Sequence, residues 1–401
     1  MKPPPLPLEE AQTRLLALAT ALPVERVDVA SALGRYLAEP LTARRTQPAA
    51  HLSAMDGYAV CGSDLPGPWT VIGESAAGHP FGGAVAAGQA VRLATGALLP
   101  PGADAVVLQE DVALMGDALS LTGTPPSPAN RHVRHCGSDF HADHVLLPAG
   151  ARLGPAQLAL ALAAGHNHLA VRRKVRVAIL DSGDELSADA EACAQHQIPA
   201  SNGTMLAAMV AAVPCQVQRI GPVRDDLDTL KDSLEQAVSA DVIVTTGGAS
   251  VGDHDLIRPA LESWGAQLDF WRVAIKPGKP LLVATRAHQI ILGLPGNPVS
   301  SHVTAYHFLL PLLRMLLGAA QPLPRAIRLP LQGSVGAGGE RREFLRARLV
   351  PAGVEPLTTQ DSGALAAMAA ADGLIDRPAG AAAKTPGDVV EVYLLGNGSI
   401  A

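Results

Sequence analysis

The sequence has few aromatic residues and no excess of positive charge. Aromatic side chains make up only 3% of the 401 residues, so small aliphatic side chains must fill the cores, and the apolar content of 48% is sufficient for that. The formal net charge of -6 and a pI near 6.1 exclude a basic field over the whole surface. We therefore expect no nucleic-acid partner, and any site for an anion must be local.

Targeting, membrane and disulfide features are also missing. The start, MKPPPLPLEE, contains neither a basic segment followed by an apolar one nor a lipidation signal. The longest apolar run, near residues 153–165, is too short and too interrupted by glycine to cross a bilayer. The four cysteines form no C-x-x-C pair and are scattered over the chain at Cys61, Cys136, Cys193 and Cys215. We expect a cytoplasmic protein with reduced thiols and no membrane contact.

Glycine and proline are abundant, and they divide the chain into many short elements. The length predicts roughly two to four domains. Helical spacing of leucines in residues 8–22 and 151–165 flanks a stretch of short apolar runs separated by Gly and Pro. This order predicts a helical domain (1–43 and 148–172) that is interrupted by an inserted β-rich domain (44–147).

The second half of the chain has a different pattern. Residues 173–318 alternate strand-like and helix-like segments, which predicts βαβ units and a parallel sheet covered on both faces. Residues 319–401 contain strand-like runs and one short helical segment, which predicts a small C-terminal β domain. The expected fold class is therefore a multidomain α/β protein.

Acidic residues follow three successive strands of the expected parallel sheet. They are Asp181, Asp184, Glu185, Asp225, Asp226, Asp253 and Asp255. For any single one of them, helix capping or a solvated loop is an adequate explanation. Because parallel strands end at one edge of a sheet, the set as a whole favours a shared Mg²⁺ ion.

Two further turns belong to the same region of sequence. The segment KPGKP holds Lys276 and Lys279 in a turn stiffened by prolines, and LPGNP places Asn297 and Pro298 at a helix start with free backbone N–H groups. Two surface lysines and an ordinary capped helix remain open as alternatives. The seven acidic residues would repel an anionic ligand unless a divalent cation lay between them. We therefore expect a divalent cation at this site.

Two other segments contain polar residues, but in both of them an ordinary loop or turn is the favoured interpretation. The segment HVRHCGSDFHADH crowds histidines and Cys136 together, but no second cysteine pair or HExxH helix accompanies them, so a loop is favoured over a zinc site. The turn at Asp56-Gly57, taken alone, indicates a β-hairpin. The chain lacks G-x-S-x-G, Walker A and G-x-G-x-x-G signatures, which leaves Mg²⁺-dependent group transfer as the favoured chemistry.

Several long motifs resemble one known family. They are SAMDGYAV (53–60), RLATGALLPPGADAVVLQE (92–110), SGDEL (182–186), VRDD (223–226), TTGGASVGDHD (245–255), IKPGKP (275–280) and GLPGNPVS (293–300). In this order, and over nearly the whole chain, they resemble the molybdopterin molybdenumtransferase (MoeA) family, whose relatives include the C-terminal domain of gephyrin.

The resemblance implies an elongated subunit of four parts and a homodimer whose site is completed by the β-rich domain of the second subunit. It implies Mg²⁺-dependent use of molybdate to displace AMP from adenylylated molybdopterin, which gives molybdenum cofactor. Adenylylated molybdopterin and molybdate would be the substrates. Molybdopterin adenylyltransferase and molybdoenzyme chaperones would be transient partners.

The resemblance also implies particular site residues. From the β-rich domain these are Asp56, Thr95 and Asp139. From the α/β domain they are Glu185, Asp225, Gly247, Gly248, Ser250, Asp255, Lys276, Lys279, Pro295 and Pro298, and from the C-terminal domain Arg341 and Ser362. Glu185, Asp225 and Asp255 are the implied metal ligands, while Ser250, Arg341 and Ser362 look like molybdate-side positions.

The sequence departs from the family pattern at three positions. Ser138 stands where an acidic residue is common, Asp181 where a small hydroxyl residue is usual, and Arg342 where a proline is expected. Two other functions are possible for such a fold. A non-catalytic scaffold would be expected to carry a fused adenylyltransferase domain and a long linker, and a nicotinamide-nucleotide hydrolase would not be expected to carry the MDGYA and KPGKP segments.

Overall fold

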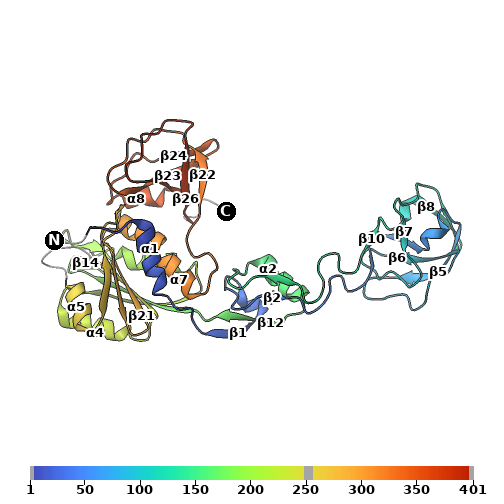
Figure 1. Cartoon of the computed structure of the whole chain (residues 1–401), viewed down its shortest axis with the longest axis horizontal. Helices are drawn as coiled ribbons and strands as arrows, with labels where there is room; N and C mark the ends of the chain where they lie inside the picture. Colours follow the sequence, from blue (N-terminus) through green and yellow to red (C-terminus); the bar gives the residue numbers. More distant parts are fainter. Residues whose placement is uncertain (1–3, 248–255, 397–401) are drawn as a thin grey trace.

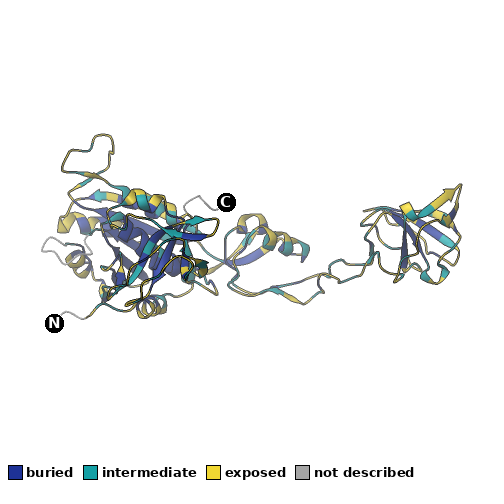
Figure 2. Ribbon diagram, turned by 90° about the horizontal axis from the view of Figure 1, so that it is seen from above, coloured by how far each residue is buried: buried dark blue, intermediate teal, exposed yellow. Residues whose placement is uncertain are grey.

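The chain forms an elongated molecule. The computed structural model describes residues 4–247 and 256–396. An α/β domain and the C-terminal domain lie at one end, the β-rich domain lies at the other, and a slender region connects them (Figure 1). Buried residues concentrate in the sheets at the two ends, whereas the connection is mostly exposed or half-buried (Figure 2).

The α/β domain is built on a six-stranded sheet. The strand order is β16-β13-β17-β21-β20-β18. The bounds are β13 (Val175–Ser182), β16 (Cys215–Val223), β17 (Val242–Thr246), β18 (Gln267–Trp271), β20 (Leu282–Arg286) and β21 (Gln289–Leu294). The first four strands in this order are parallel, as predicted, but β20 and β18 are antiparallel to their neighbours. The sheet is therefore mixed, because a tight turn between β20 and β21 reverses the chain instead of a crossover helix.

Helices cover both faces of this sheet. Along β13, Val177 and Ile179 face one apolar core, and Ala178 and Leu180 face another. The first core is closed by α1 (Leu8–Ala17), α3 (Ser201–Val210), α6 (Pro298–Thr304), a π-helix (Ala305–Leu309) and α7 (Leu310–Leu316). The second core is closed by α4 (Leu227–Gln236) and α5 (Ile257–Ser263). Successive side chains of β13 thus point to opposite faces of the sheet, and both faces are buried, as expected for a sheet covered by helices on both sides.

The slender region contains strands as well as helices. Its pairs are β1 (Val24–Asp28) with β12 (His168–Arg172) and β2 (Leu41–Thr42) with β11 (Val145–Leu147). A 3-10 helix (Val29–Ala32) and α2 (Pro155–Ala163) complete it. Helix α1, which precedes this region in the chain, packs instead against the α/β domain. The helical domain expected from the sequence is therefore a mixture of short strands and helices, and α1 is not part of its core.

The β-rich domain is a six-stranded sheet of order β7-β4-β6-β5-β9-β8. Its strands are β4 (Gly57–Val60), β5 (Trp69–Ser75), β6 (Gln89–Leu93), β7 (Ala105–Leu108), β8 (Val112–Met115) and β9 (Ala118–Leu121), with 3-10 turns at Gly62–Asp64 and Gln109–Asp111. At its neck, β3 (Leu52–Ser53) pairs with β10 (Val133–Arg134). Apolar cores lie on both sides of this sheet.

The C-terminal sheet has the order β19-β23-β25-β26-β22. Its strands are β22 (Ala326–Pro330), β23 (Arg342–Val350), β25 (Gly373–Arg377) and β26 (Val389–Leu394), with β24 (Gly353–Pro356) on β23 and α8 (Leu365–Ala369) beside it. The edge strand β19 (Ile275–Lys276) comes from the α/β segment of the chain. Two small strands, β14 (Leu186–Ser187) and β15 (Ile198–Pro199), pair near α3. Within the described ranges, no helix is long and apolar enough to span a membrane.

Candidate functional site

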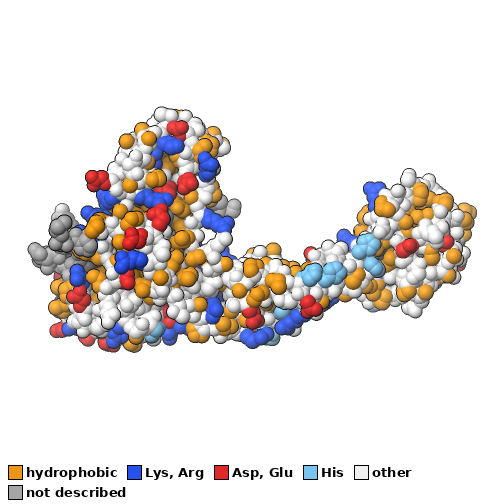
Figure 3. Space-filling model, in the orientation of Figure 1, with side chains coloured by type: hydrophobic (Ala, Val, Ile, Leu, Met, Phe, Trp, Pro, Cys, Tyr) orange, Lys and Arg blue, Asp and Glu red, His pale blue; other side chains and the backbone are white. Residues whose placement is uncertain are grey.

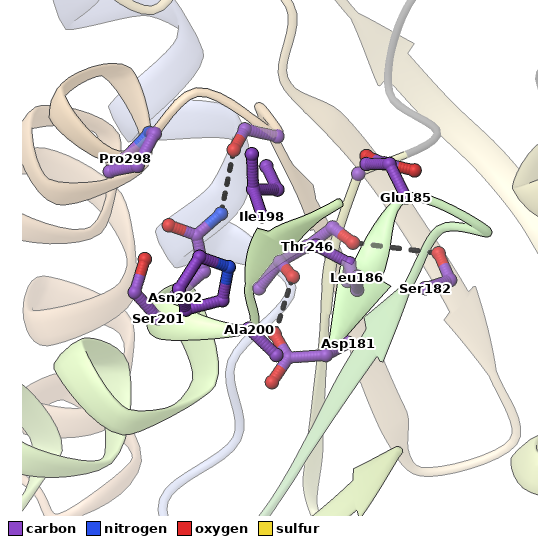
Figure 4. A pocket seen from close by; sticks show the side chains of 13 residues that line it. Asp181, Ser182, Glu185, Leu186, Ile198, Ala200, Ser201, Asn202, Thr246 and Pro298 are labelled. Carbon is purple, nitrogen blue, oxygen red and sulfur yellow. Dashed lines mark hydrogen bonds between the residues drawn. The ribbon is translucent and has the colours of Figure 1, made fainter. Parts of the chain in front are cut away.

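A pocket lies where the parallel strands of the α/β sheet end. Figure 4 shows it between the ends of β13 and β17, the start of α3 and the start of α6. Its lining residues are Asp181, Ser182, Glu185, Leu186, Ile198, Pro199, Ala200, Ser201, Asn202, Thr246, Gly247, Gly296 and Pro298. The carboxyl edge of an open α/β sheet is the usual place for a ligand. The pocket brings together three of the predicted residues: Glu185, Gly247 and Pro298.

Gly247 begins the glycine-rich turn after β17. Its φ is +87°, and a Cβ atom there would lie 2.7 Å from the carbonyl oxygen of Ser182. Only glycine fits this conformation and this close approach of two strand ends. The continuation of the turn, with Gly248, Ser250 and Asp255, lies outside the described residues.

Asp181 supplies a buried carboxyl group to the pocket wall. The hydroxyl of Thr246 donates to Asp181 Oδ1 at 2.6 Å, and the Arg219 guanidinium lies 3.7 Å from Oδ2. Burial raises the pKa of Asp181 above its ordinary value, although the Thr246 hydrogen bond and Arg219 oppose this. The sequence drew attention to this residue as one of the acidic residues at the strand ends and as a departure from the family pattern.

Asn202 was missed by the sequence analysis. Its Nδ2 donates to the backbone carbonyl of Gly296 at 2.7 Å (Figure 4), which fixes the orientation of the amide because a carbonyl can only accept. Its Oδ1 is buried and has no hydrogen-bond partner among the described residues. The available signal was a polar residue beside Ser201 at the start of an otherwise apolar helix.

Three of the acidic residues predicted at the strand ends, Asp184, Glu185 and Asp225, lie near one another. The backbone N–H of Asp225 donates to Asp184 Oδ1 at 3.3 Å. Burial, and then the charges of Asp184 and Glu185, raise the pKa of Asp225. The structure therefore places these three carboxylates within electrostatic reach of one another. Asp226 instead caps α4 by accepting from the N–H groups of Asp228 and Thr229.

Carboxylate oxygens are the ligands that Mg²⁺ prefers, and mutually repelling carboxylates gain from a cation. The donor set of Glu185 and Asp225 therefore fits Mg²⁺, which needs only one or two protein carboxylates. Over residues 4–247 and 256–396, however, no group of three His, Cys, Asp or Glu side chains is arranged to hold a metal ion. The third predicted ligand, Asp255, is not among the described residues.

The histidine-rich loop (132–144) contacts itself and His51 on the adjacent segment of the neck. His51 and His135 meet edge to face, as do His141 and His144, and the N–H of Cys136 donates to His51 Nδ1 at 3.2 Å. Figure 3 shows histidine side chains gathered where the β-rich domain joins the rest of the chain. Within the described part of the chain, these residues form no metal-holding group of three.

The cations and the C-terminal residues meet beside the sheet edge. Lys276 Nζ donates to Glu343 Oε1 at 2.9 Å, and Arg341 donates to the carbonyl of Ile275 at 3.3 Å. Lys279 is exposed in the same turn. The structure thus brings Arg341 of the C-terminal domain next to the KPGKP turn.

The start of α6 follows the sequence prediction. Asn297 caps the helix by accepting from the N–H of Ser300 at 3.4 Å, and Pro298 is the first helical residue. Asn297 Nδ2 also lies 3.5 Å from the hydroxyl of Ser362, and Pro295 is buried just before the turn. Ser362 therefore lies beside the helix start.

Asp56, Thr95 and Asp139 are not in this pocket. Asp56 accepts from the backbone N–H and the hydroxyl of Thr95, at 2.6 and 2.8 Å, and these bonds lower its pKa. Asp139 is exposed at the neck of the β-rich domain, where its N–H donates to the carbonyl of Gln47 at 3.1 Å. Within one chain the β-rich domain, with Asp56 and Thr95, lies at the opposite end of the molecule from the pocket (Figure 1).

The fold and the pocket define a multidomain α/β protein with a partly polar pocket at the carboxyl edge of its parallel strands. Three family models match the chain: the MoeA N-terminal region (domain I and II) at residues 6–165, a probable molybdopterin binding domain at 178–315, and the MoeA C-terminal region (domain IV) at 328–395. The chain belongs to the molybdopterin molybdenumtransferase (MoeA) family, a family of transferases, which confirms the resemblance predicted from the motifs.

Individual relatives agree with this assignment. The molybdopterin molybdenumtransferase of Haemophilus influenzae is 36% identical over 320 residues, which is 79% of each chain. That of Synechococcus elongatus is 35% identical over 399 residues, 95% of this chain and 97% of the relative. A solved structure of the molybdopterin biosynthesis MoeA protein from Pyrococcus horikoshii superposes with a TM-score of 0.80 at 30% identity, and covers 98% of this chain and 99% of that chain.

Proposed function

We propose that this protein is a molybdopterin molybdenumtransferase that uses molybdate to displace AMP from adenylylated molybdopterin and so yields molybdenum cofactor. Its relatives bear this name over most of the chain. The observation that carries the proposal is the pocket at the sheet edge, where Glu185, Gly247 and Pro298 meet in one lining. We place the reaction in the cytoplasm, with transient contacts to molybdopterin adenylyltransferase and molybdoenzyme chaperones.

The chain's own residues would bind and orient the substrates. Glu185 and Asp225, together with Asp255, would hold Mg²⁺, which when bound neutralises phosphate charge. Lys276, Lys279 and Arg341 would compensate further oxyanion charge, with Ser250 and Ser362 on the molybdate side. Backbone N–H groups at Gly247 and Gly248, and at the helix start bounded by Pro295 and Pro298, would cradle the remaining oxygens.

No side-chain nucleophile is required. In this proposal an oxygen of molybdate attacks the adenylyl phosphorus and displaces the molybdopterin phosphate, which gives an adenylyl-molybdate anhydride. Water then cleaves this anhydride to AMP and molybdate, and the two thiols of molybdopterin bind the molybdenum as one molybdate oxygen leaves as water. Catalysis then depends on positioning and charge compensation, which is how phosphoryl-transfer sites generally work.

The active unit in this proposal is a homodimer. Asp56 and Thr95 form a hydrogen-bonded pair that lies far from the pocket of the same chain. A second subunit that brings its β-rich domain to the pocket would join the two groups. A two-fold symmetric dimer makes two such sites at once.

The deciding assay is AMP release from adenylylated molybdopterin with Mg²⁺, with and without molybdate. We expect molybdate-dependent release that stops with EDTA. Lys279→Ala should lower the rate about a hundredfold, because one oxyanion-stabilising group is worth about that much. Correctly folded wild-type protein that releases no AMP, but binds a partner protein tightly, would support a scaffold instead.

A further inference from the structure

The KPGKP turn is joined to the C-terminal domain by a short strand pair. β19 runs parallel to β23, with Ile275 opposite Arg342 and Lys276 opposite Glu343. The N–H of Arg342 donates to the carbonyl of Ala274 at 3.0 Å. This hydrogen bond joins the α/β segment of the chain to the start of the C-terminal sheet through the backbone of Arg342, at the seam between the two domains.

Arg342 strengthens the same seam through its side chain. Its Nε donates to Asp376 Oδ1 at 2.7 Å, and its guanidinium also pairs with Asp376 Oδ2 and with Glu9 of α1. Hydrogen bonds from Arg342 to Asp376, opposed by burial, raise the pKa of the guanidinium further. The start of β23 is thus held by the α/β domain's first helix and by its own sheet, so Glu343 projects from a fixed backbone.

Glu343 is the partner of Lys276 in this arrangement. The Lys276 Nζ to Glu343 Oε1 distance is 2.9 Å, and the two side chains are 56% and 17% exposed. A lysine side chain loses much conformational freedom when it is fixed, so an exposed lysine is usually poorly placed. The half-buried carboxylate of Glu343, on a fixed strand, restricts the Lys276 side chain before the substrate binds. The lysine is therefore preorganised.

The other side of the turn is also fixed. Gly278 has φ +109°, and a Cβ atom there would lie 2.5 Å from Thr304 Oγ1 of α6. The turn is therefore clamped between α6 and β23. The side chain of Lys276 reaches across the domain seam to Glu343.

We propose that Glu343 is a positioning residue that holds the Lys276 ammonium group at the place where substrate oxyanion charge must be compensated. This inference rests on the proposed function, because it assigns Glu343 a role only through Lys276. Arg342 supports it by fixing the strand from which Glu343 projects.

A double-mutant cycle tests this inference. Glu343→Ala should lower kcat/KM for AMP release about tenfold in the wild-type background. In the Lys276→Ala background the same change should have less than a twofold effect, because the group that Glu343 positions is absent. Glu343→Gln keeps an acceptor for the ammonium group and should recover part of the loss. Melting temperatures would show that all variants fold.

A matched control is available at the other end of β23. Glu355→Gln removes the acidic partner of Arg348, a pair that is 3.2 Å apart on the same sheet. This control should leave kcat/KM unchanged. An equal loss from Glu343→Ala in both Lys276 backgrounds would mean that Glu343 acts structurally, and it would overturn the inference.

The same four proteins can be compared by their Kd for AMP. This second cycle separates failure of the inference from failure of the proposed function. If the wild-type protein binds AMP but does not release it from adenylylated molybdopterin, the proposed reaction fails, while the affinity cycle still reports on Glu343. If the effects of the two substitutions on the Kd of AMP simply add, positions 276 and 343 are not coupled. That result would overturn the inference about Glu343 and leave the proposed reaction untouched. The coupling should fall as salt is raised, because the pair is partly exposed.

Discussion

At the residue scale, the carboxylates at the strand ends carry the strongest agreement between sequence and structure. Asp184 follows β13 and Asp225 follows β16, and the backbone N–H of Asp225 donates to Asp184 Oδ1 at 3.3 Å. Parallel strand topology makes this convergence predictable from the strand pattern alone. The sequence pattern could not tell the role of Asp226 from that of Asp225. Capping of α4 depends on which of these two adjacent aspartates faces the helix start.

Asp225→Asn tests the electrostatic cost of this cluster. The folded-state pKa of Asp225 is raised by burial, Asp184 and Glu185, so its ionised form destabilises the fold, and this cost grows as pH rises above the ordinary carboxyl value. We expect the variant to melt about 1–2 °C higher than wild type at pH 7 in EDTA.

Added Mg²⁺ should raise the melting temperature of wild type but not of Asp225→Asn. A thermal melt with and without MgCl2 checks this, and Asp228→Asn, on the exposed start of α4, is the matched control. Equal responses to Mg²⁺ in wild type and Asp225→Asn would remove Asp225 from the metal site.

Asp241 lies just before β17, and its effect on stability should depend on pH in the opposite direction to that of Asp225. Burial disfavours its ionised form, but hydrogen bonds from Arg173 and Arg176 outweigh this and lower its pKa from 3.8 to about 2. Its stabilising effect is therefore complete above the ordinary value and is lost as pH falls toward 2. Asp241→Asn should cost about 2 kcal/mol at pH 7, and the gap to wild type should close as the pH falls from about 4 to 2.

Urea unfolding at several pH values measures this gap. A difference between Asp241→Asn and wild type that stays constant down to pH 2 would contradict the assigned ionic partners.

At the element scale, periodicity predicted the parallel strands but not the reversal at the edge of the sheet. The run from Leu281 to Leu294 is apolar on both sides of a short polar break, and such a run fits either a hairpin or a crossover. The structure resolves it into β20 and β21 with Ala287 at φ +52° in the turn. The predicted α/β architecture survives because the binding edge is formed by β13, β17 and β21, which run parallel to one another.

Gly278→Ala tests how firmly the KPGKP turn must be seated on α6. An added Cβ would have to push Thr304 aside at a backbone conformation with φ +109°. We expect a loss of about 2 kcal/mol in unfolding free energy. The rate of AMP release should fall more than tenfold, because the lysines shift by about an ångström.

Gly265→Ala is the matched control for this turn. Gly265 has φ +88° but open space around its Cα, so its substitution carries the backbone cost without the collision. Thermal melts and turnover of both variants check the contrast. Equal loss of activity in the two variants would show that the contact with Thr304 is unimportant.

At the scale of the whole molecule, the sequence motifs named residues that a single chain does not bring together. The Asp56 and Thr95 pair lies in the β-rich domain, at the far end from the pocket that contains Glu185 (Figure 1). Strand and helix patterns carry no information about the distance between domains joined by a slender connection. The resemblance to a family with a two-subunit site was the only sequence-level basis for linking these residues.

Mixing two inactive variants tests that link. In the proposed dimer each site takes Asp56 from one subunit and Glu185 from the other. Asp56→Ala and Glu185→Ala homodimers should therefore each lose at least 99% of the rate of AMP release, about 3 kcal/mol of transition-state stabilisation. After subunit exchange, about half the dimers should be mixed, and each mixed dimer contains one intact site and one site with both substitutions.

The mixture should then recover about one quarter of the wild-type rate, measured per subunit after mild dissociation and reassociation. A mixture of Glu185→Ala with Asp225→Ala is the matched control, because both changes affect the α/β half of the site and no pairing restores it. Recovery in the control would show that Glu185 and Asp225 come from different subunits. No recovery in the Asp56 and Glu185 mixture despite subunit exchange would place the whole site within one subunit. That result would require the β-rich domain to fold back across the slender region onto its own chain.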